Sequence, residues 1–211
     1  MFVTCYSIST KDGYWANSRL CWEAEQTASL ETESYYVAEL AYYVSGIFIH
    51  VFLDQPLKDY WVMFSHHVIT ILLIYCSYVF GYQRVGMLVL LCHDVSDIFL
   101  DYAKCFHYLD LDMLSTLTFV NMLISWVLYR LYYYPTIAIN SAMFESIEEG
   151  PKPKFHELFC IWLSLLQILH VYWFGLMLDV ARRRLFEGEI EDVRDDEAVK
   201  RQSSQRKPKT H

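Results

Sequence analysis

Five apolar segments, each long enough to cross a bilayer as a helix, limit what this chain can fold into. They run approximately over residues 35–53, 61–80, 85–106, 113–134 and 155–180. A membrane-spanning helix needs roughly 17–25 mostly apolar residues, and every segment reaches that length. Strand signals are weak, because neither alternation of apolar and polar residues nor hairpin turns recur. We therefore expect an all-α, polytopic membrane protein with about five transmembrane helices.

Polar or turn-forming residues separate the segments and divide the chain into three regions. Short breaks fall at 54–56, 81–84 and 110–112, and a long connection is expected over 135–154. Residues 1–34 precede the membrane domain of 35–180, and a charged tail follows over 181–211. We expect most of that tail to be disordered, because it holds too few apolar residues to build a core.

Ionisable side chains occur inside the second and third apolar segments, where charge is expensive. The second segment carries His66 and His67. The third segment carries His93, Asp94, Asp97, Asp101 and Lys104. A charge at the centre of a bilayer costs about 2.5 kcal/mol or more, so such residues usually face a cavity and serve function. We expect these segments to form neighbouring helices that share one buried site.

Helical geometry places the polar residues of each segment on one stripe, since each residue advances a helix by about 100°. In the second segment, His66, Thr70 and Ser77 fall within about 40° of one another, and His67 lies about 100° from His66. Within about 100° of arc, the third segment holds His93, Lys104, Asp97, Asp101 and Asp94. The other stripes are Glu39, Tyr43 and His50, then Thr118, Asn121 and Ser125, and finally Gln167 with His170.

Helices with one polar stripe keep that stripe away from lipid when they form a barrel around a polar cavity. Interhelical hydrogen bonding without chemistry is the favoured role for Thr118, Asn121, Ser125 and Gln167. A functional role is favoured for His66, His67, His93, Asp94 and Asp97. Several buried charges cost too much to serve as structure alone. Asp101 and Lys104 either form an i,i+3 ion pair near the membrane surface or belong to the site.

The histidines allow three kinds of chemistry, because a buried imidazole can be a nucleophile, a general base or a metal ligand. A neighbouring carboxylate would fix its tautomer and stabilise the imidazolium. No G-x-S-x-G elbow accompanies the histidines, so a hydroxyl nucleophile is not indicated. The HxxxH and HxxHH spacings of membrane di-iron oxygenases are also absent, and we expect no metal. The net charge of −8 and the lack of a basic face argue against nucleic acid as a partner.

The six cysteines show no C-x-x-C spacing, and four of them fall in or beside apolar segments. Buried small hydrophobes are therefore the favoured interpretation, and a Cys5–Cys21 disulfide is the alternative.

A multi-part motif runs through the second and third segments. It comprises His66-His67-x-x-Thr70, Ser77-Tyr78, Arg84-x-Gly86, His93-Asp94-x-Ser96-Asp97 and Lys104. This combination resembles the longevity-assurance motif of ceramide synthases, which are sphingosine N-acyltransferases with a TLC domain. Glu39 and Tyr43 upstream, and Gln167 and His170 in the last segment, agree with the same family. The resemblance covers residues 1–197 and implies that the helices form most of a TLC-type barrel.

The resemblance also implies a reaction and roles for individual residues. Members of the family join the acyl group of an acyl-CoA to a long-chain sphingoid base as an amide, with no further cofactor. The implied intermediate is an acyl-imidazole at His66 or His67, and the stripe slightly favours His66. Asp94 and Asp97 would orient the histidines, and His93 would accept the proton of the attacking amine. Roles in substrate binding or structure are expected for Glu39, Tyr43, Thr70, Ser77, Tyr78, Arg84, Ser96, Asp101, Lys104, Asn121, Gln167 and His170.

Two other functions stay open at this point. One is a non-catalytic TLC protein for lipid sensing or transport, and the other is an inactive fragment that modulates full-length synthases. The family implies the bilayer and a second synthase chain, in a homo- or heterodimer, as further partners. Its members carry two more membrane helices upstream. Because residues 1–9 resemble the end of one, with a luminal loop over 10–34, we expect the sequence to be truncated at its N-terminus.

Basic residues after the last segment favour a cytosolic C-terminus. Arg182-Arg183-Arg184 follows that segment directly, and positive charge is enriched on the cytosolic side. The final Lys207-Pro208-Lys209-Thr210-His211 matches the K-x-K-x-x form of a retrieval signal, and a solvated basic tail is the equal alternative. The family and this signal both predict the endoplasmic reticulum membrane.

Overall fold

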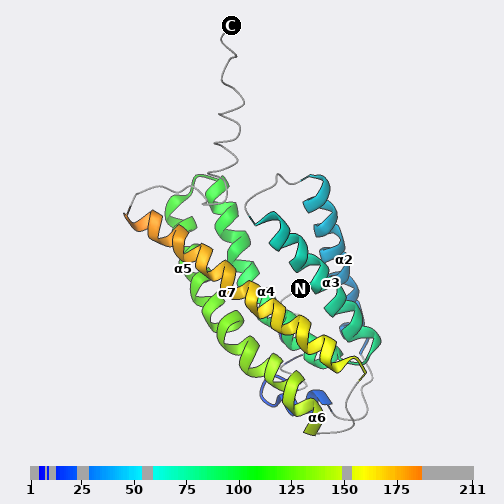
Figure 1. Cartoon of the computed structure of the whole chain (residues 1–211). Coiled ribbons are helices and arrows are strands. Elements are labelled where there is room, and N and C mark those ends of the chain that lie inside the picture. The colour runs from blue at the N-terminus through cyan, green and yellow to red at the C-terminus, as the bar shows by residue number, and fades with distance from the viewer. Residues whose placement is uncertain are drawn as a thin grey trace.

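The computed structural model describes residues 5–7, 9, 13–22, 29–53, 59–148 and 154–186, and every regular element in these ranges is helical (Figure 1). The long helices are α2 (Leu30–Phe52), α3 (Tyr60–Val79), α4 (Gln83–Tyr108), α5 (Asp112–Ser125) and α7 (His156–Phe186). The remaining elements are η1 (Ser18–Trp22), η2 (Trp126–Ile139), η3 (Ser141–Glu145) and α6 (Ser146–Glu148). The predicted all-α class is confirmed.

The long helices form a bundle in which α7 crosses the other elements. Figure 1 shows the α2–α3 pair on one side of α4, with α5 and its continuation η2 on the other. Along its length, α7 packs against both α3 and η2. Large apolar side chains stay exposed on the outer faces, among them Val37, Phe48, Ile124, Ile161 and Ile168. Such faces suit contact with lipid.

Three helices are long and apolar enough to cross a membrane. They are Tyr60–Val79, the continuous run Asp112–Glu148, and His156–Arg184. These correspond to the second, fourth and fifth apolar segments. The first and third segments also form long helices, α2 and α4, and their crossing of the membrane stays a prediction.

The helical period correctly placed the buried faces of α2 and α3. Helix α2 begins at Ser29, whose hydroxyl accepts a hydrogen bond from the backbone N–H of Thr32 at 3.2 Å and so caps the first turn. Its buried residues recur every three or four positions and include Tyr35, Tyr36, Glu39, Tyr43 and His50. On α3 the buried face is His66, Thr70, Leu73, Ile74 and Ser77. Both predicted stripes therefore face the interior.

Helix α4 occupies the centre of the bundle, and all residues over 85–93 are buried. Gly86 permits a close approach there. A Cβ at this position would overlap the Tyr36 hydroxyl and lie 3.1 Å from the Ser77 Oγ. The Tyr36 hydroxyl donates to the carbonyl of Gln83 at 2.9 Å, and Ser77 donates to that hydroxyl at 3.2 Å. The glycine therefore lets α2, α3 and α4 meet through one hydrogen-bonded group.

The fourth segment continues as a helix to residue 148, so the long connection expected over 135–154 is wrong for residues 135–148. Pro135 lies inside η2, which is a π-helix, and helical turns continue through η3 and α6. Proline lacks an N–H and normally disrupts a helix interior. Here the residues that follow are small and fully enclosed: Ala138, Ser141 and Ala142. They pack near α7, where the ring of His156 lies 2.8 Å from the Ala142 carbonyl.

The region before α2 covers one end of the bundle. Arg84 donates to the carbonyl of Leu20 at 2.7 Å, and the Trp22 indole donates to Ser141 at 2.9 Å. Cys5 and Cys21 are both buried and neither is part of a disulfide, so the alternative Cys5–Cys21 bridge is not formed. Burial raises the pKa of Cys21 to about 12, which keeps it a neutral, small apolar group.

Replacing Gly86 by alanine should destabilise the bundle, because the added methyl would push Tyr36 and Ser77 apart. Overpacking of this kind typically costs about 1–3 kcal/mol. Thermal unfolding in detergent should show a lower apparent midpoint for Gly86→Ala. Gly175→Ala is the matched control, because nothing lies within 4 Å of a Cβ there. An equal drop for both variants would contradict the close approach.

Candidate active site

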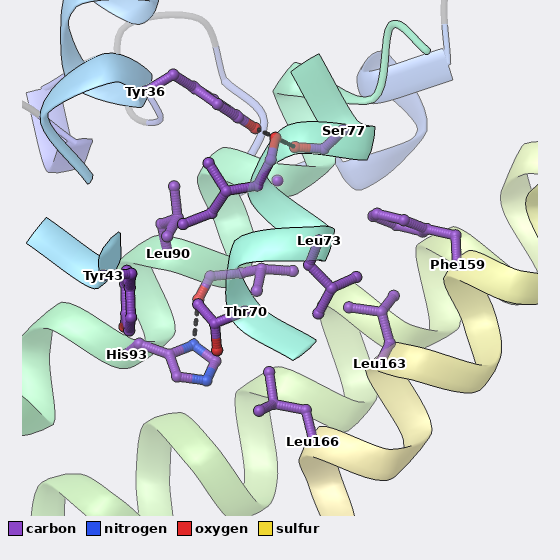
Figure 2. A pocket seen from close by; sticks show the side chains of 13 residues that line it. Tyr36, Tyr43, Thr70, Leu73, Ser77, Leu90, His93, Phe159, Leu163 and Leu166 are labelled. Carbon is purple, nitrogen blue, oxygen red and sulfur yellow. Dashed lines mark hydrogen bonds between the residues drawn. The ribbon is translucent and has the colours of Figure 1, made fainter. Parts of the chain in front are cut away.

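A narrow, mostly apolar cavity lies between α2, α3, α4 and α7 (Figure 2). His93 stands at one end, with Tyr43 and Thr70 beside it. The other end is formed by Tyr36 and Ser77. Aliphatic side chains line the length between: Leu73, Ile74, Val89, Leu90, Leu163 and Leu166. The cavity walls are thus more apolar than the polar stripes predicted, because much of the charged face of α4 lies beyond it.

The histidine pair lies next to this cavity, across Tyr43. The Tyr43 ring centroid is 6.1 Å from those of both His66 and His67. His66 is buried and its ring meets Trp173 edge-on at 5.1 Å. Within the described part of the chain, His66 Nδ1 and Thr70 Oγ1 are buried without a hydrogen-bond partner. Two such atoms one turn apart are unusual, because buried polar atoms are nearly always satisfied.

His67 has a defined tautomer, unlike its neighbour. Its Nδ1 lies 2.9 Å from the carbonyl of Met63, which can only accept, so Nδ1 carries the proton. The Nε2 faces Gly46 on α2, where a Cβ would lie 3.0 Å away. The ring of His67 also stacks on His50 at 5.9 Å. The two adjacent histidines therefore point to different surroundings, as the angular separation on the helix predicted.

A hydrogen bond joins His93 and His170 at the end of the cavity. Their Nε2 atoms lie 2.9 Å apart, and both rings are buried. His93 Nδ1 donates to the carbonyl of Val89 at 2.7 Å. A neutral His93 therefore accepts at Nε2, and His170 donates to it. The sequence predicted both residues but not their pairing.

Arg130 is the part of the site that sequence reasoning missed. It is buried in η2, and its guanidinium donates to Asp97 at 2.5 Å, to Ser96 at 3.2 Å and to the carbonyl of His93 at 3.1 Å. The same group lies 4.1 Å over the ring of Trp126. A signal was available, because Arg130 is the sole charged residue in the segment 113–134.

The two predicted catalytic aspartates have partners other than histidine. Asp97 pairs with Arg130, while Asp94 accepts from the hydroxyl of Tyr35 at 2.7 Å. The expectation that they orient the histidines is therefore not met by any hydrogen bond in the described residues. The reason is geometric: α4 presents its histidine towards α7 and its aspartates towards η2 and α2.

Several other predicted residues serve structure or lie outside the cavity. Arg84 anchors the region before α2, and Tyr78 is 41% exposed. Asp101 and Lys104 are exposed, and no ion pair joins them in the described part of α4. Glu39 is buried on the inner face of α2, one turn from Tyr43.

The three predicted polar residues of α5 bond within their own helix, so the interhelical bonds expected for them are wrong. Thr118 donates to Leu114 at 2.8 Å and Asn121 donates to Leu117 at 2.9 Å. Ser125 likewise donates within its own turn. These side chains have carbonyls of the preceding turn within reach, which compete with partners on other helices. On α7, Gln167 Oε1 is buried without a partner among the described residues.

The site offers imidazoles for covalent and proton-transfer chemistry. His66 supplies a buried ring with an unsatisfied nitrogen, and the His93–His170 pair can gain or pass a proton. Across the described ranges, no three His, Cys, Asp or Glu side chains come together as metal ligands.

Comparison with known proteins assigns a relationship to nearly the whole chain. The sequence pattern of the TLC domain matches residues 1–179. Ceramide synthase 1 LOH3 of Arabidopsis thaliana is 30% identical over 210 residues, which cover 92% of this chain and 68% of the relative. Ceramide synthase 5 of Mus musculus is 36% identical over 194 residues, which cover 89% of this chain and 46% of the relative. Ceramide synthase hyl-2 of Caenorhabditis elegans is 33% identical over 172 residues, which cover 77% of this chain and 52% of the relative. The chain thus spans about half to two thirds of these relatives.

Removing the charge of Arg130 should destabilise the protein strongly. Arg130→Gln leaves the acceptors on Asp97, Ser96 and His93 without the buried cation that binds them, and losing a hydrogen bond to a charged group typically costs about 1.5–3 kcal/mol. Thermal unfolding in detergent measures the loss. Arg182→Gln is the control, because the Arg182–Asp179 pair is exposed and such pairs contribute about 0–1 kcal/mol. Similar midpoints for the two variants would show that Arg130 is not structural.

Proposed function

The chain belongs to the TLC-domain family, and we propose that it is a ceramide synthase, joining the acyl group of an acyl-CoA to a sphingoid base. One observation carries the proposal. His66 and Thr70 present unsatisfied polar atoms beside a narrow apolar cavity that ends at His93. An acyl thioester would place its polar carbonyl at those atoms and its hydrocarbon chain in the cavity.

The first step is transfer of the acyl group to an imidazole. A ring nitrogen of His66 attacks the thioester carbonyl, the bond to sulfur breaks, and the CoA thiolate leaves. His66 is favoured over His67 because it lies on the inner face of α3 and its Nδ1 has no described partner. The Thr70 hydroxyl, also without a described partner, is placed to donate to the developing oxyanion.

The second step is attack of the amine on the acyl-imidazole. The new amide bond forms as the bond to the imidazole breaks, and the amine loses a proton. The His93–His170 pair takes up that proton at His170 Nδ1, the nitrogen of the pair that has no described hydrogen-bond partner, and the proton then passes to the CoA thiolate to give the thiol. This extends the predicted role of His93 to a pair, because His170 already occupies its Nε2.

Arg130 has a positioning role in this scheme. It binds the carbonyl of His93 and the carboxylate of Asp97, and so holds the proton-accepting pair against η2. The Asp97 side chain is 40% exposed, which leaves it accessible to the ammonium group of an approaching sphingoid base. Asp94 adds a second carboxylate three residues earlier on α4, where it accepts from the hydroxyl of Tyr35.

The cellular location, the co-substrate and the partners follow from the same family assignment. We place the chain in the endoplasmic reticulum membrane with a cytosolic C-terminus, supported by the basic run Arg182–Arg184 after α7. Acyl-CoA serves as co-substrate and no other cofactor is needed. A dimer with a second synthase chain stays a prediction. Part of the predicted region 1–34 and most of the region 181–211 lie outside the described residues. The non-catalytic alternative is not favoured, since the relatives are named as ceramide synthases.

Loss of the histidine pair should abolish amide formation. Membranes that contain the protein are incubated with labelled acyl-CoA and a sphingoid base, and the labelled ceramide is measured. We expect His66→Ala to lower the rate about 100-fold or more and the double variant with His67→Ala to give none. His107→Ala, an exposed residue near the end of α4, should leave the rate unchanged. Ceramide formation by the double variant at the wild-type rate would refute the assignment.

Crowding the second histidine should slow the reaction without removing any polar group. In Gly46→Ala the new methyl presses on His67 Nε2 and Cδ2, at 3.0 and 3.2 Å from the ideal Cβ. Displacing a group at an active site by about 1 Å can cost about 100-fold, so we expect a loss of 10-fold or more. The rate assay above measures it, with Gly175→Ala as the control. An unchanged rate would place His67 outside the reaction.

A further inference from the structure

A single aromatic ring separates the cavity at His93 from a second apolar hollow. The second hollow is lined by Cys76, Phe80, Tyr82, Phe155, Leu158, Phe159 and Trp162. Phe159 is the one residue that also lines the first cavity. Figure 2 shows its side chain at one side of the cavity, beyond Leu73 and Leu163 as seen from His93, while Tyr36 and Ser77 form the far end. The two spaces therefore adjoin at this ring.

Phe159 is held in place from the outer side. It is buried, and its ring stacks on Tyr82 at 4.7 Å with an interplanar angle of 11°. Tyr82 is fixed in turn, because its hydroxyl donates to the carbonyl of Lys154 at 2.7 Å. Beyond this pair the hollow opens towards the outside, since Phe155 is 61% exposed. The Phe159 ring thus forms a partition between the two spaces, and Tyr82 holds it in place.

The distance from the reacting groups to this partition suits one acyl chain. Phe159 and His170 are eleven residues apart on α7, which corresponds to about 16 Å of helix rise. Half of a hydrocarbon core about 30 Å thick is a similar length, and one lipid acyl chain covers it in a bilayer leaflet. The inner cavity is about 20 Å³ in this structure, so its lining side chains must move apart for an acyl chain to enter. A chain that extends beyond this length of helix would meet the Phe159 ring.

On the basis of the proposed function, we propose that Phe159 closes the acyl-chain cavity and sets the longest acyl group that the protein accepts. A chain that is longer than the inner cavity requires the ring to move and the outer hollow to receive its end. The class of substrate that Phe159 excludes is therefore very-long-chain acyl-CoA.

The test compares palmitoyl-CoA with lignoceroyl-CoA in the ceramide assay. For Phe159→Ala we expect the ratio of lignoceroyl to palmitoyl product to rise about 10-fold or more, the scale on which a methylene pocket discriminates. Phe159→Leu should move the ratio in the same direction and guards against misfolding of the alanine variant. Phe155→Ala is the matched control, because Phe155 lines the outer hollow alone. A ratio unchanged in both Phe159 variants, or moved equally by Phe155→Ala, would overturn the proposal.

A binding measurement separates this inference from the proposed function. Unreactive thioether analogues of the two acyl-CoAs are added to the purified wild type and the variants, and protection against thermal unfolding is recorded. Stronger protection of Phe159→Ala by the longer analogue supports the partition even without turnover. Protection of the wild type with no amide product would overturn the proposed reaction, and equal protection profiles in all variants would overturn the role of Phe159.

Discussion

The buried guanidinium of Arg130 is the interaction on which the interior of the bundle depends. A charge among membrane helices must find partners inside the protein, and the described hydrogen-bond acceptors of Arg130 lie on α4. One of these partners is the carbonyl of His93, whose ring is paired with His170 on α7. Three helices are therefore held in register by one cation and the two rings beside it. Any motion of η2 relative to α4 would therefore change the position of the His93–His170 pair.

The sequence was sufficient for the directions in which helices present their side chains. Spacing alone placed His66, Thr70 and Ser77 on one buried face, because a regular helix leaves no freedom in the angle between residues. The same argument put His67 to one side, where the structure places it against α2. Family resemblance then supplied the chemistry, which angles cannot provide.

Partners across helices were beyond the reach of that reasoning. Asp94 and Asp97 were assigned to the histidines because they share a helix face, yet they meet Tyr35 and Arg130. Such contacts depend on how each helix is rotated and shifted against its neighbours, which a one-dimensional pattern does not encode. The prediction of a connection from Pro135 onward was wrong for a related reason. Proline normally ends a helix, but here the helix continues through the enclosed small residues that follow it.

The continuous helical run from Asp112 to Glu148 ties the protein to the physical state of its membrane. With 37 residues it exceeds what a hydrocarbon core of about 30 Å can hold upright, so it must tilt or protrude. The preferred tilt changes with bilayer thickness, at a cost of fractions of a kcal/mol per ångström of mismatch. Arg130 lies on this run and binds the carbonyl of His93. A change of tilt with bilayer thickness would therefore shift the His93–His170 pair. A lipid-making protein built in this way would respond to the lipids around it.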